Sequence, residues 1–249
     1  MDLSLNEEQK MIAESAAVFL QEKSTSAQVR RACESGGMDR ALWREAVDLG
    51  WCGVALPEKA GGMGLGWREL ALLQEQMGYY LACVPFFDAV VALTPLWTHL
   101  SQTDAGLAVV QRLAQSGQVC VLGMTLRGAL SAAARVSVQG DDLVLDGEWP
   151  QVGSGAHADV LLLPATLPDG TLALLEVPAR APGLTVQALA TIDATRSSAH
   201  VAASGVHLPA AAVLVQGQAL SGLWAQTRHL AAIGLAAEQV GVADRALDL

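Results

Sequence analysis

Four glycines lie within six residues, and residues of this type at this spacing could form a phosphate-binding loop. They are Gly61, Gly62, Gly64 and Gly66, just before a helical pattern. Such clusters often cradle phosphate at a helix N-terminus. A phosphate loop, however, needs Gly-x-x-x-x-Gly-Lys-Ser/Thr, or Gly-x-Gly-x-x-Gly after a strand. Here Trp67 follows, no lysine completes the motif and no strand precedes it, so the cluster favours a tight backbone crossing.

A second glycine motif, from Gly153 to Ala158, matches the Gly-x-Gly-x-x-Ala form of a dinucleotide-binding fingerprint. That fingerprint must open a helix, because the helix N-terminus receives the pyrophosphate. The motif instead runs into residues 158–163, an apolar run that is typical of a strand. We therefore do not expect a Rossmann fold.

The remaining reactive side chains form no recognisable catalytic or metal-binding pattern. The histidines lack zinc-ligand spacing, so no metal site is expected. A Gly-x-Ser-x-Gly nucleophile elbow is also missing. The cysteines contain no Cys-x-x-Cys pair and are expected to be reduced, buried thiols. The residues concerned are His99, His157, His200, His207 and His229, and Cys33, Cys52, Cys83 and Cys120.

Composition narrows the class of protein. The chain has 249 residues, of which 52% are hydrophobic and 16% charged, and its net charge is −10. An acidic chain is a poor candidate for nucleic-acid binding, which needs a basic surface. No uninterrupted apolar run is long enough to span a membrane, and the N-terminus is polar. These features predict a cytoplasmic protein without a membrane span or signal peptide.

Residues 1–117 are expected to form an N-terminal helical domain. Asn6, followed by Gln9 at the capping-box position, predicts the first helix. Apolar residues then recur at helical spacing between glycine and proline interruptions. Further helices are expected over residues 26–35, 39–50, 67–77, 86–100 and 103–116, with the helix over 86–100 kinked at Pro95.

Residues 118–217 are expected to form a central β domain, an antiparallel barrel or sandwich. Turn residues separate short apolar runs, and residues 139–142 and 168–170 predict hairpins. The expected strands are 119–124, 134–138, 143–145, 159–163, 171–177, 184–189, 200–203 and 211–215.

Residues 218–249 return to a helical pattern, which predicts the first helix of a C-terminal helical domain. Together with the two preceding domains, this helix predicts an α+β class. An apolar helix needs a partner to cover it, so we expect the apolar face of residues 223–247 to cause self-association.

Four segments carry a resemblance to the acyl-CoA dehydrogenase family of flavoproteins. The segment 56–66 (LPEKAGGMGLG) looks like the family's proline–glutamate–x–x–glycine–glycine loop, which in this family is a structural crossing. The other segments are 43–53 (WREAVDLGWCG), EQMG at 75–78 leading to ACVP at 82–85, and AAEQVG at 236–241 leading to ALDL at 246–249. The resemblance covers essentially the whole chain.

The resemblance implies a helical domain, a β domain and a C-terminal four-helix bundle, with FAD between the last two. It implies oxidation of an acyl-CoA thioester to its 2,3-enoyl form, in fatty acid or steroid degradation. A carboxylate removes the α proton while a hydride passes to the flavin, and hydrogen-bond donors stabilise the developing enolate. An electron-transfer flavoprotein or similar acceptor and a homo- or hetero-oligomer are also implied.

The same resemblance assigns candidate flavin contacts and shows departures from the family pattern. Thr125 and Ser131 stand where two hydroxyls touch the flavin, but Leu126 and Ala132 replace the usual glutamate and aspartate. Near flavin N5, Gln151 and Gly153 stand at the family's aromatic and hydroxyl positions, while Val152 keeps the aliphatic one. An alternative register that uses Trp149 as the aromatic residue fits less well. Ser154 would reach the hydroxyl position only with a shifted backbone. The candidate cofactor-binding residues are Met124, Thr125, Ser131, Gln151, Val152 and Gly153.

No catalytic residue can be named from the resemblance. The family's chains run on beyond the matched length, and many members carry their base there. The earlier position that a subset uses for its base is Ala231 in this sequence. Three hypotheses remain open: part of a complete acyl-CoA dehydrogenase, a degenerate subunit that pairs with a competent one, or a non-catalytic scaffold.

Overall fold

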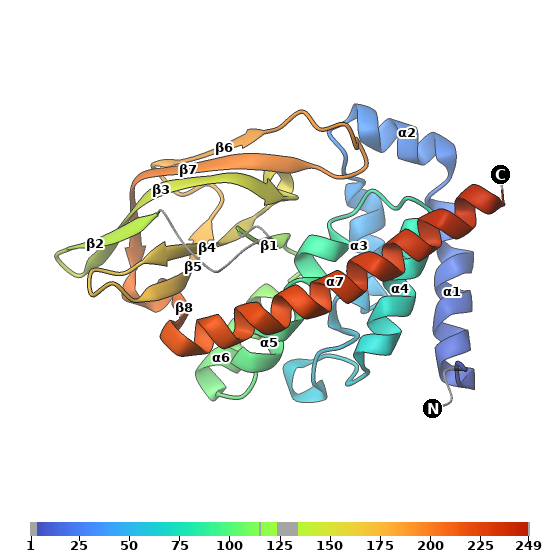
Figure 1. Ribbon diagram of the computed structural model, residues 1–249, viewed down its shortest axis with the longest axis horizontal. Helices are drawn as coiled ribbons and strands as arrows, with labels where there is room; N and C mark the ends of the chain where they lie inside the picture. Colours follow the sequence, from blue (N-terminus) through green and yellow to red (C-terminus); the bar gives the residue numbers. More distant parts are fainter. Residues whose placement is uncertain (1–3, 115, 124–133, 249) are drawn as a thin grey trace.

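The computed structural model describes residues 4–114, 116–123 and 134–248 of the chain. Its N-terminal part is helical, as predicted (Figure 1). The amide of Gln9 donates to Asn6 Oδ1 at 2.8 Å and the amide of Asn6 donates to Gln9 Oε1 at 3.1 Å, which confirms the capping box. The helices of this part are α1 (Glu7–Lys23), α2 (Ser26–Glu34), α3 (Arg40–Asp48), α4 (Trp67–Tyr79), α5 (Thr94–Leu100) and α6 (Asp104–Leu113).

The glycine-rich segment ahead of α4 folds back over the backbone of the short helix η1 (Trp51–Gly53) and the residues after it. The amide of Gly64 donates to the carbonyl of Leu56 at 2.9 Å, and the amide of Met63 donates to the carbonyl of Gly53 at the same distance. A Cβ on Gly62 would lie 2.2 Å from the oxygen of Leu56. The contacts confirm a tight crossing that requires glycine. Because these amides donate within the segment, they are not available to a phosphate.

The apolar stretch 86–100 differs from the single kinked helix that the sequence predicts. A π-helical turn, η3 (Phe87–Val91), comes first, and α5 then begins at Thr94. Pro95 therefore lies in the first turn of a new helix, where its missing N–H costs no hydrogen bond. π-Helical turns are uncommon and often occur at functional sites.

Among the described residues, eight strands form one sheet in the order β6-β7-β3-β2-β4-β5-β8, with β1 paired to β4. Most neighbouring strands are antiparallel, which confirms the predicted class, but β4 pairs in parallel with β1 and β2. The strands are β1 (Cys120–Leu122), β2 (Arg135–Gln139), β3 (Asp142–Gly153), β4 (Val160–Thr166), β5 (Leu172–Pro178), β6 (Leu184–Ala188), β7 (Ser198–Pro209) and β8 (Val213–Gln216).

Strands β3 and β7 are much longer than the sequence indicates, 12 residues each instead of the short runs 143–145 and 200–203. Glycine and proline interrupt the alternation of β3, but pairing with β7 holds the strand together. The register shifts between Trp149 and Val152, so β3 carries a bulge at Pro150 and Gln151. Proline lacks an N–H and is tolerated at such a bulge.

The long helix α7 (Gly217–Leu247) leaves the sheet after β8 and crosses α5 and α4 (Figure 1). At the crossing with α4, backbones rather than side chains meet. A Cβ on Gly78 would lie 2.1 Å from the oxygen of Glu238, and a Cβ on Gly241 would lie 1.9 Å from the oxygen of Glu75. The glycines of two segments that carry the family resemblance therefore set the distance between these helices.

The outer face of α7 remains partly apolar. Leu223 is buried, so the predicted exposure of the whole stretch 223–247 is wrong at its beginning. Ile233, Val240 and Leu247 are exposed, at 54%, 50% and 86% of their full area, and recur every seven residues. We call these three residues, with Ala236 and Ala243 between them, the α7 seam.

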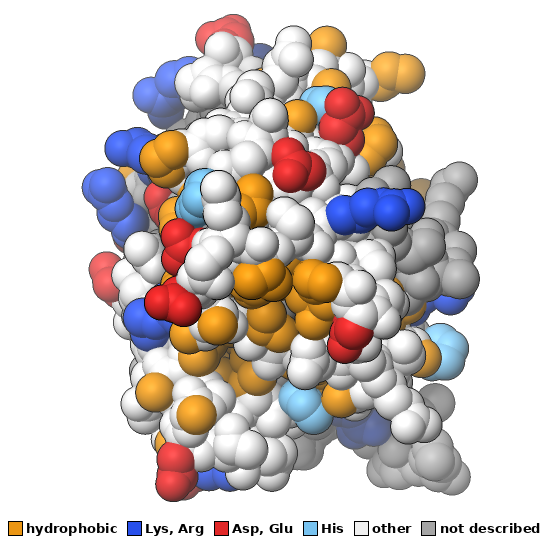
Figure 2. All heavy atoms as spheres, turned by 90° about the vertical axis from the view of Figure 1, so that its left-hand side faces the viewer, with side chains coloured by type: hydrophobic (Ala, Val, Ile, Leu, Met, Phe, Trp, Pro, Cys, Tyr) orange, Lys and Arg blue, Asp and Glu red, His pale blue; other side chains and the backbone are white. Residues whose placement is uncertain are grey.

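The helical part and the sheet share one core. Trp43, Met77 and Phe86 belong to the same buried cluster as Leu145 and Leu161. The space-filling view of the sheet end shows hydrophobic side chains gathered near its centre, with charged side chains around them (Figure 2). Among the described residues, no helix has the length and apolar character needed to cross a membrane.

Candidate functional site

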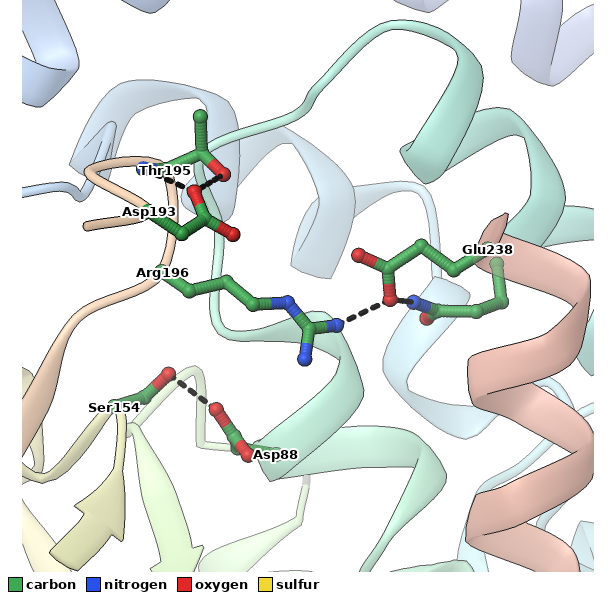
Figure 3. A network of polar contacts seen from close by, with 7 residues as sticks. Asp88, Ser154, Asp193, Thr195, Arg196 and Glu238 are labelled. Carbon is green, nitrogen blue, oxygen red and sulfur yellow. Dashed lines mark hydrogen bonds and ion pairs between the residues drawn. The ribbon is translucent and has the colours of Figure 1, made fainter. Parts of the chain in front are cut away.

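Side chains from five segments meet in a polar cluster where the sheet, η3 and α7 come together (Figure 3). We define this polar cluster as Gln74 of α4, Asp88 of η3, Ser154 just after β3, Arg196 in the loop before β7, and Glu238 of α7. The sequence separation of these residues means that only the tertiary fold brings them together.

Asp88 contacts the end of β3 directly. The hydroxyl of Ser154 donates to Asp88 Oδ2 at 2.6 Å. Ser154 has a φ of 52°, which is uncommon for a residue with a side chain, and its amide donates to the carbonyl of Ser197 at 2.9 Å. A Cβ on Gly153 would lie 2.4 Å from Asp88 Oδ1. The backbone of residues 153–154 is therefore shaped around this carboxylate.

Arg196 links the sheet to α7. Its guanidinium forms an ion pair with Glu238, and Gln74 Nε2 donates to the same Glu238 oxygen. The guanidinium carbon also lies 4.8 Å from the ring centre of Phe87, a favourable cation–π distance. In the same loop, Asp193 accepts hydrogen bonds from the amide and hydroxyl of Thr195, at 2.9 and 2.6 Å.

Both carboxylates of the polar cluster hold protons more tightly than usual. Burial raises the pKa of Asp88, although the Ser154 hydrogen bond and the positive charge of Arg196 oppose the rise. Burial also raises the pKa of Glu238, against the influence of Arg196 and Gln74, while the charge of Asp88 adds to the rise. Desolvation disfavours the charged form and dominates here.

A cavity of about 30 Å³ lies within the polar cluster, which is room for roughly two water molecules. Among the described residues, buried Gln74 Oε1 has no hydrogen-bond partner. An ordered water is the usual partner of such an atom. The cavity can therefore hydrate the cluster, but it is too small for an organic substrate.

The expected cofactor-binding residues fall into two groups. Met124, Thr125 and Ser131 lie outside the described residues. Gln151, Val152 and Gly153 lie together at the end of β3, but they face different directions. Gln151 is exposed on the bulge, Val152 is buried in the core, and Gly153 packs against Asp88.

The structure brings together carboxylates that the sequence analysis did not assign. A carboxylate with a raised pKa can serve as a general base, provided that it reaches the reacting carbon. Asp88 is partly buried, lines the cavity and accepts a hydrogen bond from Ser154, so in this arrangement it ties the end of β3 to η3. Ala231, at the early base position, is completely buried and has no acid–base group.

One sequence signal could have identified Asp88, which is the only charged residue in the apolar run 86–92. A lone acid in such a run must find a polar partner when it is buried. Glu238 lies in a segment that carries the family resemblance, but the resemblance gave it no role. Arg196 lies in a turn and has no distinguishing local pattern.

No histidine or cysteine belongs to the polar cluster as defined, although His157 lines the same cavity. Among the described residues, no three His, Cys, Asp or Glu side chains are arranged to hold a metal ion. His157 Nε2 lies 2.8 Å from the carbonyl of Gly36, where it joins the sheet to the helical part. The four cysteines are free.

Comparisons with known proteins agree with the fold. The family model "Acyl-CoA dehydrogenase, N-terminal domain" matches residues 6–117. Acyl-CoA dehydrogenase FadE27 of Mycobacterium tuberculosis is 32% identical over 216 residues, which cover 85% of this chain and 55% of that protein. This chain therefore spans about half the length of that relative.

Two solved structures of similar proteins are each named for two components. A variant of the Tcur3481-Tcur3483 steroid ACAD superposes with a TM-score of 0.79 at 29% identity, covering 98% of this chain and 66% of that one. The ChsE4-ChsE5 complex from Mycobacterium tuberculosis gives a TM-score of 0.80 at 28% identity, covering 100% of this chain and 66% of that one.

Proposed function

The chain belongs to the acyl-CoA dehydrogenase family, and from that premise we propose that it is one subunit of an assembly that carries out FAD-dependent α,β-dehydrogenation of an acyl-CoA thioester. Members of this family bind FAD, which supplies the hydride acceptor. The proposed setting is lipid or steroid degradation, with an electron-transfer flavoprotein or similar protein as the electron acceptor.

The observation that carries the proposal is the inward orientation of the strand end expected to meet the flavin. Gly153 packs against Asp88, and the hydroxyl of Ser154 donates a hydrogen bond to the same carboxylate. Val152 is enclosed in the core, which leaves Gln151 as the exposed side chain of the expected trio. The described residues do not fit FAD by themselves, because a flavin edge needs several outward hydrogen-bonding groups.

The described residues also do not supply the proton-abstracting base by themselves. Ala231 cannot accept a proton, and the partly buried carboxylate of Asp88 already accepts a hydrogen bond from the Ser154 hydroxyl. We therefore assign neither the base nor the remaining flavin contacts to the described residues. In the proposed assembly, those groups come from other residues.

A heteromeric assembly has specific support. The two solved structures reported above are complexes of two named components, at 29% and 28% identity to this chain. The exposed α7 seam offers an apolar helix face that a further helical element could cover. We also propose three domains, 1–117, 118–217 and 218–249, the last being the first helix of a helical domain.

The test is to purify the chain alone and together with candidate dehydrogenase subunits, and to measure bound FAD by absorbance and acyl-CoA oxidation with an artificial electron acceptor. We expect colourless protein alone, and a stable complex with FAD and activity after co-expression. Stoichiometric FAD and activity in the isolated chain would overturn the need for a partner. Persistent failure to associate or to bind FAD would favour a non-catalytic scaffold.

A further inference from the structure

A groove between the helical part and the sheet carries basic side chains from four segments. It consists of two adjoining hollows of about 530 and 550 Å³, which share Arg40 of α3 and His157 of the short helix η4 (Gly155–His157). Arg31 of α2 lines only the first hollow, and Arg180, between β5 and β6, lines only the second. We call this site, with its four basic residues, the basic groove. Ligands often bind in a crevice of about this volume between two parts of a chain.

Two carboxylates also line the basic groove, but both accept hydrogen bonds from backbone amides. Asp39 Oδ1, the N-cap of α3, accepts from the amides of Ala41 and Leu42 at 3.0 and 2.9 Å. Asp159 Oδ2 accepts from the amide of Val119 at 2.9 Å. Among the described residues, no hydrogen bond or ion pair engages the guanidinium groups of the three groove arginines, all of which are exposed. These groups are therefore available to an anion, although the chain as a whole is acidic.

Helix α2, which carries Arg31, is a loosely held wall of the basic groove. Ala32 is the one buried residue of this helix, all of which the structure describes. Gly36 and Gly37, with φ values of 99° and 84°, lie in the connection from α2 to α3. A segment that buries little apolar surface has low local stability. An anion held by Arg31 and Arg40 would therefore fasten α2 to α3.

The basic groove offers cations at two places and an apolar wall beside one of them. Arg31 and Arg180 line different hollows, and Arg40 is common to both. A guanidinium group binds phosphate with two parallel hydrogen bonds, which favours a ligand that carries phosphate groups. Small apolar side chains in the second hollow suit a flat organic ring; they are Ala156, Ala158, Pro178, Ala179 and Val186.

We propose that the basic groove binds a small organic bisphosphate, a molecule with two separate phosphate groups on a body that contains a flat ring. Arg31 and Arg40 contact one phosphate, Arg180 contacts the other, and the ring lies on the apolar wall. A ligand with a single phosphate leaves one of the outer arginines unused. Binding here does not depend on the proposed dehydrogenation, because among the described residues no member of the polar cluster and no expected flavin contact lines the groove.

The experiment titrates the folded full chain with adenosine 3′,5′-bisphosphate, with AMP and with adenosine in a calorimeter. We expect saturable binding of the bisphosphate, about tenfold weaker binding of AMP, because one charge-assisted contact is lost, and no binding of adenosine. Hydrogen exchange measures the second effect. The amides of α2 should exchange more slowly when the bisphosphate is bound, because Arg31 then holds this helix in place.

Single variants separate a specific site from general attraction between charges. Arg31→Gln and Arg180→Gln should each weaken the bisphosphate about tenfold and bring its affinity close to that of AMP. Arg30→Gln and Arg44→Gln are the matched controls, because these exposed arginines lie on α2 and α3 outside the groove; they should change affinity by less than about twofold.

Circular dichroism checks that all four variants are folded, which is expected because each replaced side chain is exposed. Three results would overturn the proposal: no saturable binding of the bisphosphate, AMP that binds as tightly as the bisphosphate to the wild-type chain, or equal losses in the groove variants and the controls. Slower exchange that spares α2 would remove Arg31 from the site and overturn the proposed contact.

Discussion

The hydroxyl of Ser154 donates a 2.6 Å hydrogen bond to the partly buried carboxylate of Asp88, and this contact joins the end of β3 to the π-helical turn η3. Gly153 makes the contact possible because any Cβ there would collide with the carboxylate. Arg196 and Glu238 extend the connection to α7. The strand end expected to meet a flavin is therefore fixed by polar contacts to the helical part.

Replacing Asp88 with asparagine should reduce the pH dependence of stability. A carboxyl whose pKa is raised on folding stabilises the protein fully below its unfolded pKa, about 3.9, and that stability is lost as pH rises through the folded value. Asp88→Asn removes this loss, and each pKa unit corresponds to about 1.4 kcal/mol. Urea unfolding from pH 4 to 8 should give a flatter profile than wild type.

Some slope should remain in Asp88→Asn, because burial also raises the pKa values of Glu75 and Glu238. Removing a negative charge beside Glu238 should lower the pKa of Glu238 as well. Profiles for the variant and wild type that differ only by a constant offset would contradict the assigned titration of Asp88.

Removing the Ser154 hydroxyl should destabilise the protein at neutral pH. Ser154→Ala leaves a partly buried carboxylate without its hydroxyl donor, which typically costs about 1–3 kcal/mol. The loss should shrink at low pH, where a protonated Asp88 no longer carries the charge. Chemical denaturation measures both values. Ser137→Ala, at an exposed serine on β2, is the matched control and should change stability by less than about 0.5 kcal/mol.

Adding one methyl group to α7 should have opposite effects at two glycines. Gly241→Ala places a Cβ 1.9 Å from the oxygen of Glu75 and should force α7 from α4, at a cost of about 1–3 kcal/mol or more. Gly222→Ala meets nothing within 4 Å and should stabilise by about 0.5–1 kcal/mol, through helix propensity. Thermal and urea unfolding compare them. Equal effects would contradict the backbone contact.

Local signals predicted the elements of the fold better than their connections. Asn6 with Gln9 identified the first helix, and the glycines at 61–66 identified the crossing, because both features act within a few residues. The length of β3 was missed because Gly147 and Pro150 interrupt its pattern, while pairing with β7 supplies the missing support. The sequence predicts a kink at Pro95 instead of a new helix, because the π-helical turn before it has no simple sequence signature.

The polar cluster was even less predictable than the strands. Asp88, Arg196 and Glu238 are separated by more than forty residues from one another, so no spacing rule connects them. Family resemblance directed attention to Gln151, Val152 and Gly153, whose directions depend on the bulge in β3. Whether a side chain faces outward or into the core was decided by a one-residue change in register.

Charging the α7 seam should prevent the chain from associating through this helix. Ile233 and Val240 are half-exposed and recur at heptad spacing, and they point away from the buried stripe of α7 that includes Gly234 and Gly241. Ile233→Glu/Val240→Glu should abolish both self-association and capture of a partner subunit, because buried carboxylates would lose hydration.

The seam variant should keep its own fold, since neither side chain belongs to the core. Ser221→Glu/Gln239→Glu is the matched control, because it adds the same charge at exposed polar positions of α7 and keeps the seam. Size-exclusion chromatography with light scattering measures association, and circular dichroism measures helix content. A wild-type chain that stays monomeric at high concentration would contradict self-association, and unchanged partner capture by the seam variant would show that assembly uses another surface.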